Sequence, residues 1–166
     1  GDWSSDVCSS DLGGALTDTD VVAITVNAVN DAPVNTVPGD QTVNEDTALV
    51  FSSGNGNAIS VSDVDATTLE VSLSVNHGTL SLSGITGLTF TAGDGTGDST
   101  MVFTGSIADI NAALAGLTYQ GNLNFNGADA LTITTNDLGA TGLGGALTDT
   151  DIVAITVNAV NDAPRS

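Results

Sequence analysis

The chain has 166 residues, with 20 acidic side chains against a single Lys or Arg, so its formal net charge at pH 7 is −19. Binding to phosphate groups needs Lys or Arg, and this composition therefore excludes nucleic acid and anionic lipid surfaces as partners. A divalent cation is the natural counter-charge, although acidity alone also keeps an exported protein soluble. Because no run approaches the ~18 apolar residues of a membrane-spanning helix, we expect no direct membrane insertion.

The two ends of the chain differ from the rest. Residues 2–12 resemble the translation of a sequencing adapter, and residues 165–166 resemble the start of its complement, so we expect residues 1–12 and 165–166 to be artefacts. Without the three acids in these ends, 20 − 3 = 17 acidic residues remain, together with His77 as the one possible base and no Cys, Lys or Arg. A disulfide framework is therefore excluded.

A long segment occurs twice in the chain. Residues 143–164 read LGGALTDTDIVAITVNAVNDAP, and residues 12–33 have the same sequence except at one position, where Val21 corresponds to Ile152. Repetition at an offset of 143 − 12 = 131 residues predicts a tandem array of domains.

The repeated segment sets the expected domain boundaries. We expect residues 13–33 to be the closing strand and linker of a preceding repeat, and residues 34–164 to be one complete repeat with a single core. Val153, Ile155 and Val157 fall on one side of an extended chain, which is the period-two pattern of a strand. At ~3.3 Å per residue, ten residues of strand span roughly 33 Å, so the acidic groups before and after it gather at two poles.

Short apolar runs bounded by turn signals fill the complete repeat. Residues 32–39 contain two prolines, which fix φ and favour an extended linker between stacked domains. The runs that follow predict strands. In chain order we expect these strands at residues 41–44, 48–52, 59–62, 69–75, 79–82, 88–91, 101–104, 117–119 and 130–135, followed by the closing strand.

One short helix is expected between the strands. Ser106 suits the N-cap, Asp109 lies in the first turn, apolar residues from 107 to 114 recur at helical spacing, and Gly116 ends the helix. Many short strands at regular spacing predict an all-β fold, an Ig-like or cadherin-like Greek-key sandwich that includes this helix. The expected core consists of Val50, Ile59, Val61, Leu73, Leu80, Leu88, Phe90, Phe103, Leu114, Leu117, Phe125, Leu131, Ile133, Ile155 and Val157.

Several short motifs resemble those of cadherin repeats. Residues 134–139, TTNDLG, and residues 155–164, ITVNAVNDAP, resemble the A-x-D-x-G loop and D-x-N-D-N-x-P linker that end a cadherin repeat. Residues 62–65, SDVD, resemble the D-x-D pair, and Glu45 stands where the first-strand glutamate would be. The whole unit resembles the bacterial cadherin-like tandem repeats of large secreted adhesins of the RTX/VCBS type.

This resemblance implies a Ca²⁺ site at each junction between repeats. Ca²⁺ takes ~6–8 oxygen ligands, which carboxylates at alternate loop positions and backbone carbonyls can supply. The implied ligands at the junction with the preceding repeat are Asn30, Asp31, Asp63, Asp65 and Asp137. The implied ligands at the junction with the next repeat are Glu45, Asn161 and Asp162.

Plain structural readings stand beside these assignments. Asp63 and Asp65 could be ordinary acidic turn residues, and Asp149 and Asp151 could be extra ligands or charges that guard a strand edge. Ala159 and its counterpart in the preceding linker stand where cadherins place an aspartate, so the resemblance implies fewer ligands and weaker binding. A lone His makes no metal site, and we expect a solvent-exposed His77 in a turn.

The resemblance implies a structural function. The domain would be a calcium-binding spacer of a large secreted adhesin at the bacterial cell surface, in which Ca²⁺ stiffens the junctions between neighbouring repeats of the same chain and supports cell adhesion or biofilm formation. Alternatively, exposed loops could recognise a cell-surface glycan or protein, or repeats could adhere to each other. With no Cys, Lys or Arg and one His, we expect no enzyme activity.

Overall fold

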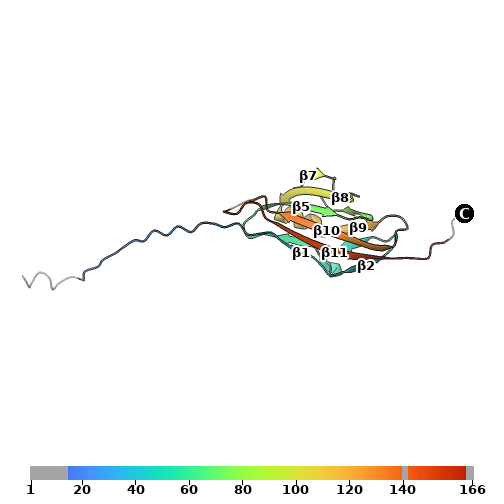
Figure 1. The fold of residues 1–166 in the computed structure, drawn as a ribbon, viewed down its shortest axis with the longest axis horizontal. Helices are drawn as coiled ribbons and strands as arrows, with labels where there is room; N and C mark the ends of the chain where they lie inside the picture. Colours follow the sequence, from blue (N-terminus) through green and yellow to red (C-terminus); the bar gives the residue numbers. More distant parts are fainter. Residues whose placement is uncertain (1–14, 140–141, 164–166) are drawn as a thin grey trace, which may run out of the picture.

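The computed structural model describes residues 15–139 and 142–163. The adapter-like residues 1–12 and 165–166 lie outside the described residues, as does Pro164 at the end of the expected repeat. Figure 1 shows a β-rich body from which the N-terminal segment extends at one end and the C-terminal segment leaves at the other. Within the described part of the chain, no helix is long and apolar enough to cross a membrane.

Eleven strands and one α-helix form this body in the described residues, together with a short 3₁₀ turn, η1 (Ser53–Asn55). The helix α1 spans Ile107–Leu114. The strands are β1 (Val34–Thr36), β2 (Gln41–Asn44), β3 (Leu49–Phe51), β4 (Ser60–Ser62), β5 (Thr68–Ser74), β6 (Gly78–Ser81), β7 (Thr89–Ala92), β8 (Thr100–Ser106), β9 (Leu117–Gly121), β10 (Gly127–Asn136) and β11 (Thr148–Asn158).

The strands are arranged in three sheets. A six-stranded sheet has the order β2-β11-β10-β5-β8-β7, a three-stranded sheet has the order β3-β9-β6, and β1 pairs with β4. Neighbouring strands are antiparallel except β2 and β11, which are parallel. The expected all-β sandwich with one short helix is confirmed.

The core lies between the large sheet and the three-stranded sheet. Alternate residues of β5, β8, β10 and β11 are buried, as the period of two requires. Burying each large apolar side chain contributes about 1.5–3 kcal/mol to stability. The largest fully buried side chains are Tyr119, Phe51, Phe103, Leu69, Leu73, Leu80, Met101, Ile110, Leu114, Leu117, Leu131 and Ile133.

The helix begins and ends as its sequence predicts. The Ser106 hydroxyl oxygen accepts a hydrogen bond from the Asp109 N–H at 3.1 Å, and Gly116 adopts a positive φ of 109° just beyond the last turn. The Asn111 side chain both accepts from and donates to the backbone of Val61 on β4. The helix therefore covers one end of the core and is fixed to the small sheet of β1 and β4.

Two expectations from the sequence are wrong. Residues 32–39 are not simply a linker, because residues 34–36 form β1 and the Asn35 N–H donates to the Asp149 carboxylate at 2.7 Å. Val50 is not in the core, because on the three-residue strand β3 it is Phe51 whose side chain is buried, while Val50 is 36% exposed. The stretch between Asn30 and β1 is therefore much shorter than expected.

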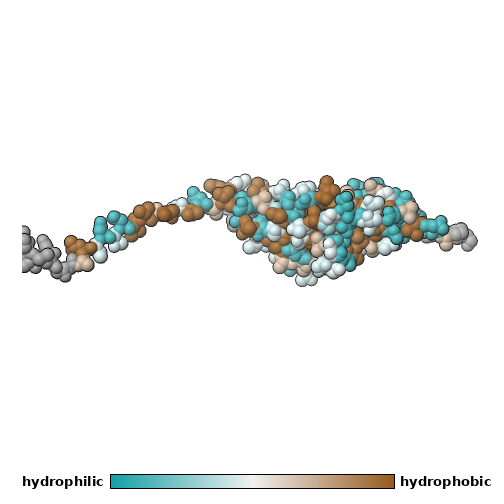
Figure 2. All heavy atoms as spheres, turned by 90° about the horizontal axis from the view of Figure 1, so that it is seen from below, coloured by the Kyte–Doolittle hydropathy of each residue, from teal (hydrophilic) through white to brown (hydrophobic). Residues whose placement is uncertain are grey.

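The N-terminal copy of the repeated segment is extended and almost unpaired. Residues 15–28 belong to no strand, and the segment joins the body at a parallel β-bridge between Val29 and Leu143, with a hydrogen bond from Leu143 to the Ala28 carbonyl. Figure 2 shows apolar side chains exposed along this segment. That residues 13–33 are the closing strand and linker of a preceding repeat stays a prediction.

Candidate functional site

The end of the domain that receives the N-terminal segment is called here the N-terminal pole, and it comprises residues 28–31, 63–65, 137–139 and 142–145. Its backbone contacts fix the incoming chain. The Leu143 N–H donates to the Ala28 carbonyl at 3.1 Å, and the Asn30 N–H donates to the Leu143 carbonyl at 3.1 Å. These two bonds make the bridge at Val29 a short piece of parallel sheet.

Gly142 allows the loop to approach this segment closely. Its φ of 91° is unfavourable for other residues, and a Cβ at this position would lie 2.9 Å from the backbone of Ala28 and from the Asn30 nitrogen. Both contacts are to backbone atoms, which cannot rotate away. A glycine is therefore required for this loop to hold the incoming chain.

The side chain of Asn30 is buried in the pole, with 5% of its surface exposed. Its Nδ2 donates to Asp137 Oδ2 at 2.5 Å and to the Gly145 carbonyl at 2.8 Å. Its Oδ1 is buried and has no hydrogen-bond partner among the described residues. A buried acceptor without a partner costs about 1–3 kcal/mol, so this oxygen is a candidate ligand atom.

Asp137 contributes a buried carboxylate to the N-terminal pole. The residue is fully buried, and its Oδ1 accepts hydrogen bonds from the backbone N–H groups of Gly139 and Leu147, both at 2.8 Å. Burial acts to raise the pKa of this carboxyl, but these bonds and the one from Asn30 outweigh burial and hold the pKa below its ordinary value. Asp137 is therefore ionised at neutral pH.

Asp63 and Asp65 form the third part of the pole. Asp65 Oδ2 accepts the Asp31 N–H at 2.8 Å, and Asp63 Oδ1 accepts the N–H groups of Asp65 and Ala66, both at 2.7 Å. These bonds form a local turn, which is the ordinary structural role considered above for Asp63 and Asp65 beside the ligand role. The other oxygen, Asp63 Oδ2, is buried and has no hydrogen-bond partner among the described residues.

The first implied ligand set is thus assembled at one pole. Asn30 contacts Asp137, Asp31 contacts Asp65, and Asp63 shares a turn with Asp65. However, among the described residues no three His, Cys, Asp or Glu side chains converge closely enough to hold a metal ion. Any cation here would also need the Asn30 amide oxygen and backbone carbonyls.

The opposite end, the C-terminal pole, comprises residues 44–46, 122–126 and 158–162. Glu45 is buried there, with 7% of its surface exposed. Its Oε1 accepts the Val160 N–H at 2.6 Å, its Oε2 accepts the Asn126 side-chain amide at 3.2 Å, and its backbone N–H donates to the Asn158 carbonyl at 2.8 Å. Glu45 therefore holds the backbone of the departing chain.

The remaining implied ligands have different surroundings. Asn161 and Asp162 follow the segment held by Glu45 and are exposed. Asp149 Oδ2 accepts the Asn35 N–H, so this carboxylate anchors β1. Asp151 is half-buried and lies opposite Ile133 of β10.

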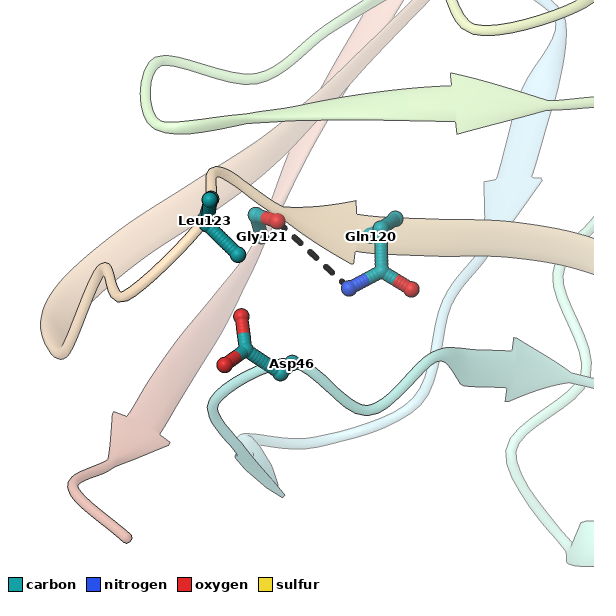
Figure 3. A pocket seen from close by; sticks show the side chains of 4 residues that line it. All are labelled: Asp46, Gln120, Gly121 and Leu123. Atoms are coloured by element: carbon teal, nitrogen blue, oxygen red, sulfur yellow. Dashed lines mark hydrogen bonds between the residues drawn. The ribbon is translucent and has the colours of Figure 1, made fainter. Parts of the chain in front are cut away.

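A shallow hollow lies at the C-terminal pole (Figure 3). Its lining consists of Asp46, Gln120, Gly121 and Leu123, and the view shows the Asp46 carboxylate pointing toward Gly121 and Leu123, where β9 ends. The Asp46 side chain accepts the Asn124 N–H at 3.2 Å, so the carboxylate has a structural partner. A carboxylate, an amide and an apolar side chain do not combine a nucleophile with a tuned base, which catalysis of acyl or phosphoryl transfer needs.

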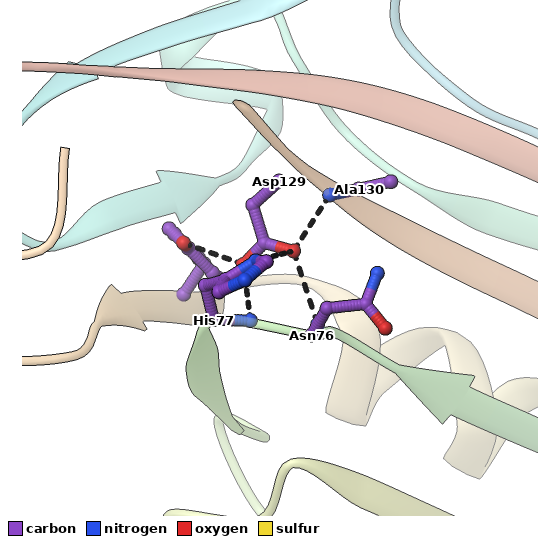
Figure 4. A network of polar contacts seen from close by, with 5 residues as sticks. Asn76, His77, Asp129 and Ala130 are labelled. Atoms are coloured by element: carbon purple, nitrogen blue, oxygen red, sulfur yellow. Dashed lines mark hydrogen bonds and ion pairs between the residues drawn. The ribbon is translucent and has the colours of Figure 1, made fainter. Parts of the chain in front are cut away.

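A buried carboxylate network was missed from the sequence (Figure 4). Asp129 on β10 accepts the N–H groups of Asn76 and His77, the Ala130 N–H and the Tyr119 hydroxyl. Burial acts to raise the pKa of Asp129, yet the Tyr119 and backbone bonds hold it below its ordinary value. Burial, and then the bond to this carboxylate, raise the pKa of Tyr119.

This network has a structural role. It fastens the turn between β5 and β6 to β10, and His77 stacks on Phe125 with ring centroids 4.5 Å apart. The His77 side chain is 51% exposed, which confirms the expected solvent-exposed turn histidine. The one signal in the sequence was the position of Asp129, which falls on the inward-facing side of a strand. A buried carboxylate needs several hydrogen-bond donors, so such a position predicts a polar network.

Comparison with known proteins identifies a sequence family. The family profile of the Protein GAMETE EXPRESSED 2 domain, GEX2, matches residues 48–142. No curated protein matches the chain. Among solved structures, a cohesin module from a Clostridium perfringens ATCC13124 family 33 glycoside hydrolase is similar, with a TM-score of 0.42, 9% sequence identity, and coverage of 76% of this chain and 98% of that module.

The matched family corrects the resemblance drawn from the linker motifs. GEX2 is a eukaryotic gamete protein family, so the identification as a bacterial cadherin-like repeat of RTX/VCBS-type adhesins is wrong. The motifs that suggested it are short runs of Asp and Asn, which occur in many acidic turns. Those at Asn30, Glu45 and Asn161 lie outside the matched residues or at their margin.

Proposed function

We propose that the chain, which belongs to the Protein GAMETE EXPRESSED 2 domain family, is a non-catalytic structural module of an extracellular adhesion protein. In this proposal tandem copies are joined end to end, and Ca²⁺ stiffens the junction between one copy and the next.

The observation that carries this proposal is the pair of buried oxygen atoms at the N-terminal pole. Asn30 Oδ1 belongs to the linker of the preceding repeat, and Asp63 Oδ2 belongs to the complete repeat, and neither has a hydrogen-bond partner among the described residues. Hard divalent cations bind such oxygen atoms. A cation held by both would join the two units.

The charges around these atoms favour a cation over a water molecule. Asp137 is ionised and fully buried, and Asp65 stands beside the incoming chain. The single Lys or Arg in the sequence is Arg165, which lies outside the described residues. Asp137 has no basic partner among the described residues, so its negative charge is free to attract a bound Ca²⁺.

The predicted affinity is modest. Few carboxylates approach each other at this pole, and backbone carbonyls and the Asn30 amide would complete the ligand set. Extracellular modules of this kind bind Ca²⁺ with dissociation constants of about 10⁻⁴–10⁻³ M. We therefore propose a site that responds to extracellular calcium concentrations.

Thermal unfolding of the chain tests this proposal, because the chain contains one complete N-terminal pole. At a free Ca²⁺ concentration of about 100 times Kd, one site adds about 2.7 kcal/mol of stability. For a protein of this size that is a rise in Tm of about 5–10 °C. We expect this rise with Ca²⁺ relative to EDTA, and a smaller one with Mg²⁺.

A pair of double variants sharpens the test. Asp63→Asn with Asp65→Asn should remove most of the Ca²⁺-dependent rise while leaving the β-core folded. Asp18→Asn with Asp40→Asn removes the same charge from exposed positions and should keep the full rise. A Tm that does not respond to Ca²⁺ would contradict the proposal and turn attention to the exposed loops as a recognition surface for a cell-surface glycan or protein.

A further inference from the structure

We propose that the Ala-Val-Asn end of each closing strand is held by two units at once, by Glu45 of its own unit on one side and by the loop at residues 142–145 of the next unit on the other. The inference rests on the tandem arrangement of the proposed function, but it does not need Ca²⁺. The occupant of the loop is thus the C-terminal pole of a second copy of this domain.

The chain shows the two halves of this junction on two copies of one sequence. Residues 28–30 and residues 159–161 are both Ala-Val-Asn, separated by the 131-residue offset. The first copy contacts the loop of the unit that follows it. The second copy contacts Glu45 of the unit that it ends.

The two sets of contacts use different backbone groups. In the loop, the Leu143 N–H donates to the Ala28 carbonyl, and the Leu143 carbonyl accepts the Asn30 N–H. The Glu45 carboxylate accepts the N–H of Val160, the central residue of the other Ala-Val-Asn copy. In an extended strand, successive residues direct their N–H and C=O groups to opposite sides. One Ala-Val-Asn end can therefore make both sets of contacts simultaneously.

The surroundings of β11 agree with this assignment of sides. Asn158 and Val160 contact Glu45, which continues β2 on one side of β11. The other side belongs to β10, whose pairing with β11 starts at Gly127 opposite Val157. Beyond that pair, Ala159 and Asn161 face the side that β10 leaves open, where the next unit's loop would lie.

The shape of the loop points to the same occupant. A Cβ on Gly142 would lie 2.9 Å from Ala28 and Asn30, so the loop fits an extended backbone in close contact. Asn30 is buried by Asp137 and the Gly145 carbonyl, whereas its copy Asn161 is exposed at the C-terminal pole. The exposed copy lacks the unit that would cover it.

The consequence is a junction with little freedom. If both sides of Ala-Val-Asn are held, only Asp31 and Ala32 separate the shared strand from buried Pro33, which precedes β1. Two residues permit little bending between units. The direction in which one unit leaves another is then set by backbone hydrogen bonds, and Ca²⁺ adds to a connection that already exists.

Amide hydrogen exchange measured by NMR in EDTA tests this inference. In the chain itself we expect slow exchange at Asn30, Leu143 and Val160, and fast exchange at Val29 and Asn161, whose N–H groups have no partner among the described residues. In a protein of two complete units joined by residues 159–164, the linker amide equivalent to Val160 should stay slow, and the one equivalent to Asn161 should exchange at least about tenfold more slowly than Asn161 at the free end.

Variants identify which contact protects which amide. Glu45→Ala in the first unit should speed exchange at the linker valine by about tenfold and leave the linker asparagine slow, and Glu45→Gln should retain part of the protection because its amide oxygen still accepts. Gly142→Ala in the second unit should act on the asparagine and not on the valine. Asp40→Ala, at an exposed position, is the control for charge.

The outcomes separate this inference from the calcium site. Fast exchange at either linker amide in the folded two-unit protein overturns the shared strand, whatever Ca²⁺ does to Tm. Slow exchange in EDTA together with a Tm that ignores Ca²⁺ supports the shared strand and removes the calcium part of the proposed function. Each variant must give the spectrum of a folded protein with unchanged core resonances, so that a change in exchange rate reports on the junction and not on unfolding.

Discussion

The two copies of the repeated segment differ in structure although they share a sequence. On β11, Val153, Ile155 and Val157 are between 1% and 3% exposed. In the N-terminal copy, the corresponding Val22, Ile24 and Val26 are between 79% and 88% exposed. The same period-two pattern forms a central strand only where β2 and β10 supply hydrogen bonds and the core covers one face. Strand formation here is decided by the neighbours.

The largest expected effect uses this difference directly. Ile155→Ala should destabilise the domain by about 2–5 kcal/mol, because it removes buried methyl groups and leaves a cavity. Ile24→Ala makes the same chemical change in the exposed copy and should alter stability by less than about 0.5 kcal/mol. Urea unfolding followed by circular dichroism measures both. Similar losses for the two variants would mean that the N-terminal copy is packed in solution.

The next comparison concerns the two linker asparagines. Asn30→Ala should cost about 1–3 kcal/mol, because it removes a donor from the buried Asp137 carboxylate. Asn161→Ala changes an exposed side chain and should be nearly neutral in this chain. The difference between their urea midpoints measures how much stability the asparagine side chain contributes when the following unit contacts it, as at Asn30, compared with when it is exposed, as at Asn161. Equal midpoints would show that the N-terminal pole does not hold the linker.

A smaller effect is expected in the pH dependence of stability. The pKa of Asp137 is held below its ordinary value of 3.8 in the folded state, so its contribution to stability is complete above the unfolded pKa and is lost as pH falls through the folded pKa. Asn30→Ala removes one of the bonds that lower this pKa, and the acid loss should therefore begin at a higher pH. Urea midpoints between pH 7 and pH 2 follow it, with Asn161→Ala expected to overlay the unmodified chain.

The smallest effect compares two aspartates of the repeated segment. Asp149→Ala removes the acceptor of the Asn35 N–H and should cost about 0.5–1.5 kcal/mol, because β1 loses one of its anchors. Its counterpart Asp18 is exposed, and Asp18→Ala should have no measurable effect. Should the two variants unfold at the same urea concentration, Asp149 would be a surface charge and not an anchor of β1.

Most of the fold follows from local patterns in the sequence. The alternation of apolar residues placed β5, β10 and β11, and the Ser106 cap with Gly116 placed the helix within one residue. β1 could not be predicted, because Val34–Thr36 is a short polar strand between two prolines whose bonds come from residues distant in sequence. Val50 was misplaced because a three-residue strand shows too little of the period to tell its faces apart.

The candidate site could be predicted in part. Asn30, Asp63, Asp65 and Asp137 do gather at one pole, yet nothing in their spacing shows that Asp63 and Asn30 each bury an oxygen without a partner. The role of Glu45 as an acceptor for Val160 depends on the parallel pairing of β2 and β11, which no local pattern reveals. Short acidic motifs also misidentified the family, because turns of any β-protein select the same residue types.

The parallel pairing of β2 with β11 has a mechanical consequence. The chain enters the body at one end and leaves it at the other (Figure 1), so tension along a tandem array pulls β11 lengthwise past its neighbours. The hydrogen bonds of ten paired positions with β10 and four with β2 lie across the direction of that pull. They would share the load in shear, and none could be opened singly from a free end. The closing strand is thus held against extension along both of its edges.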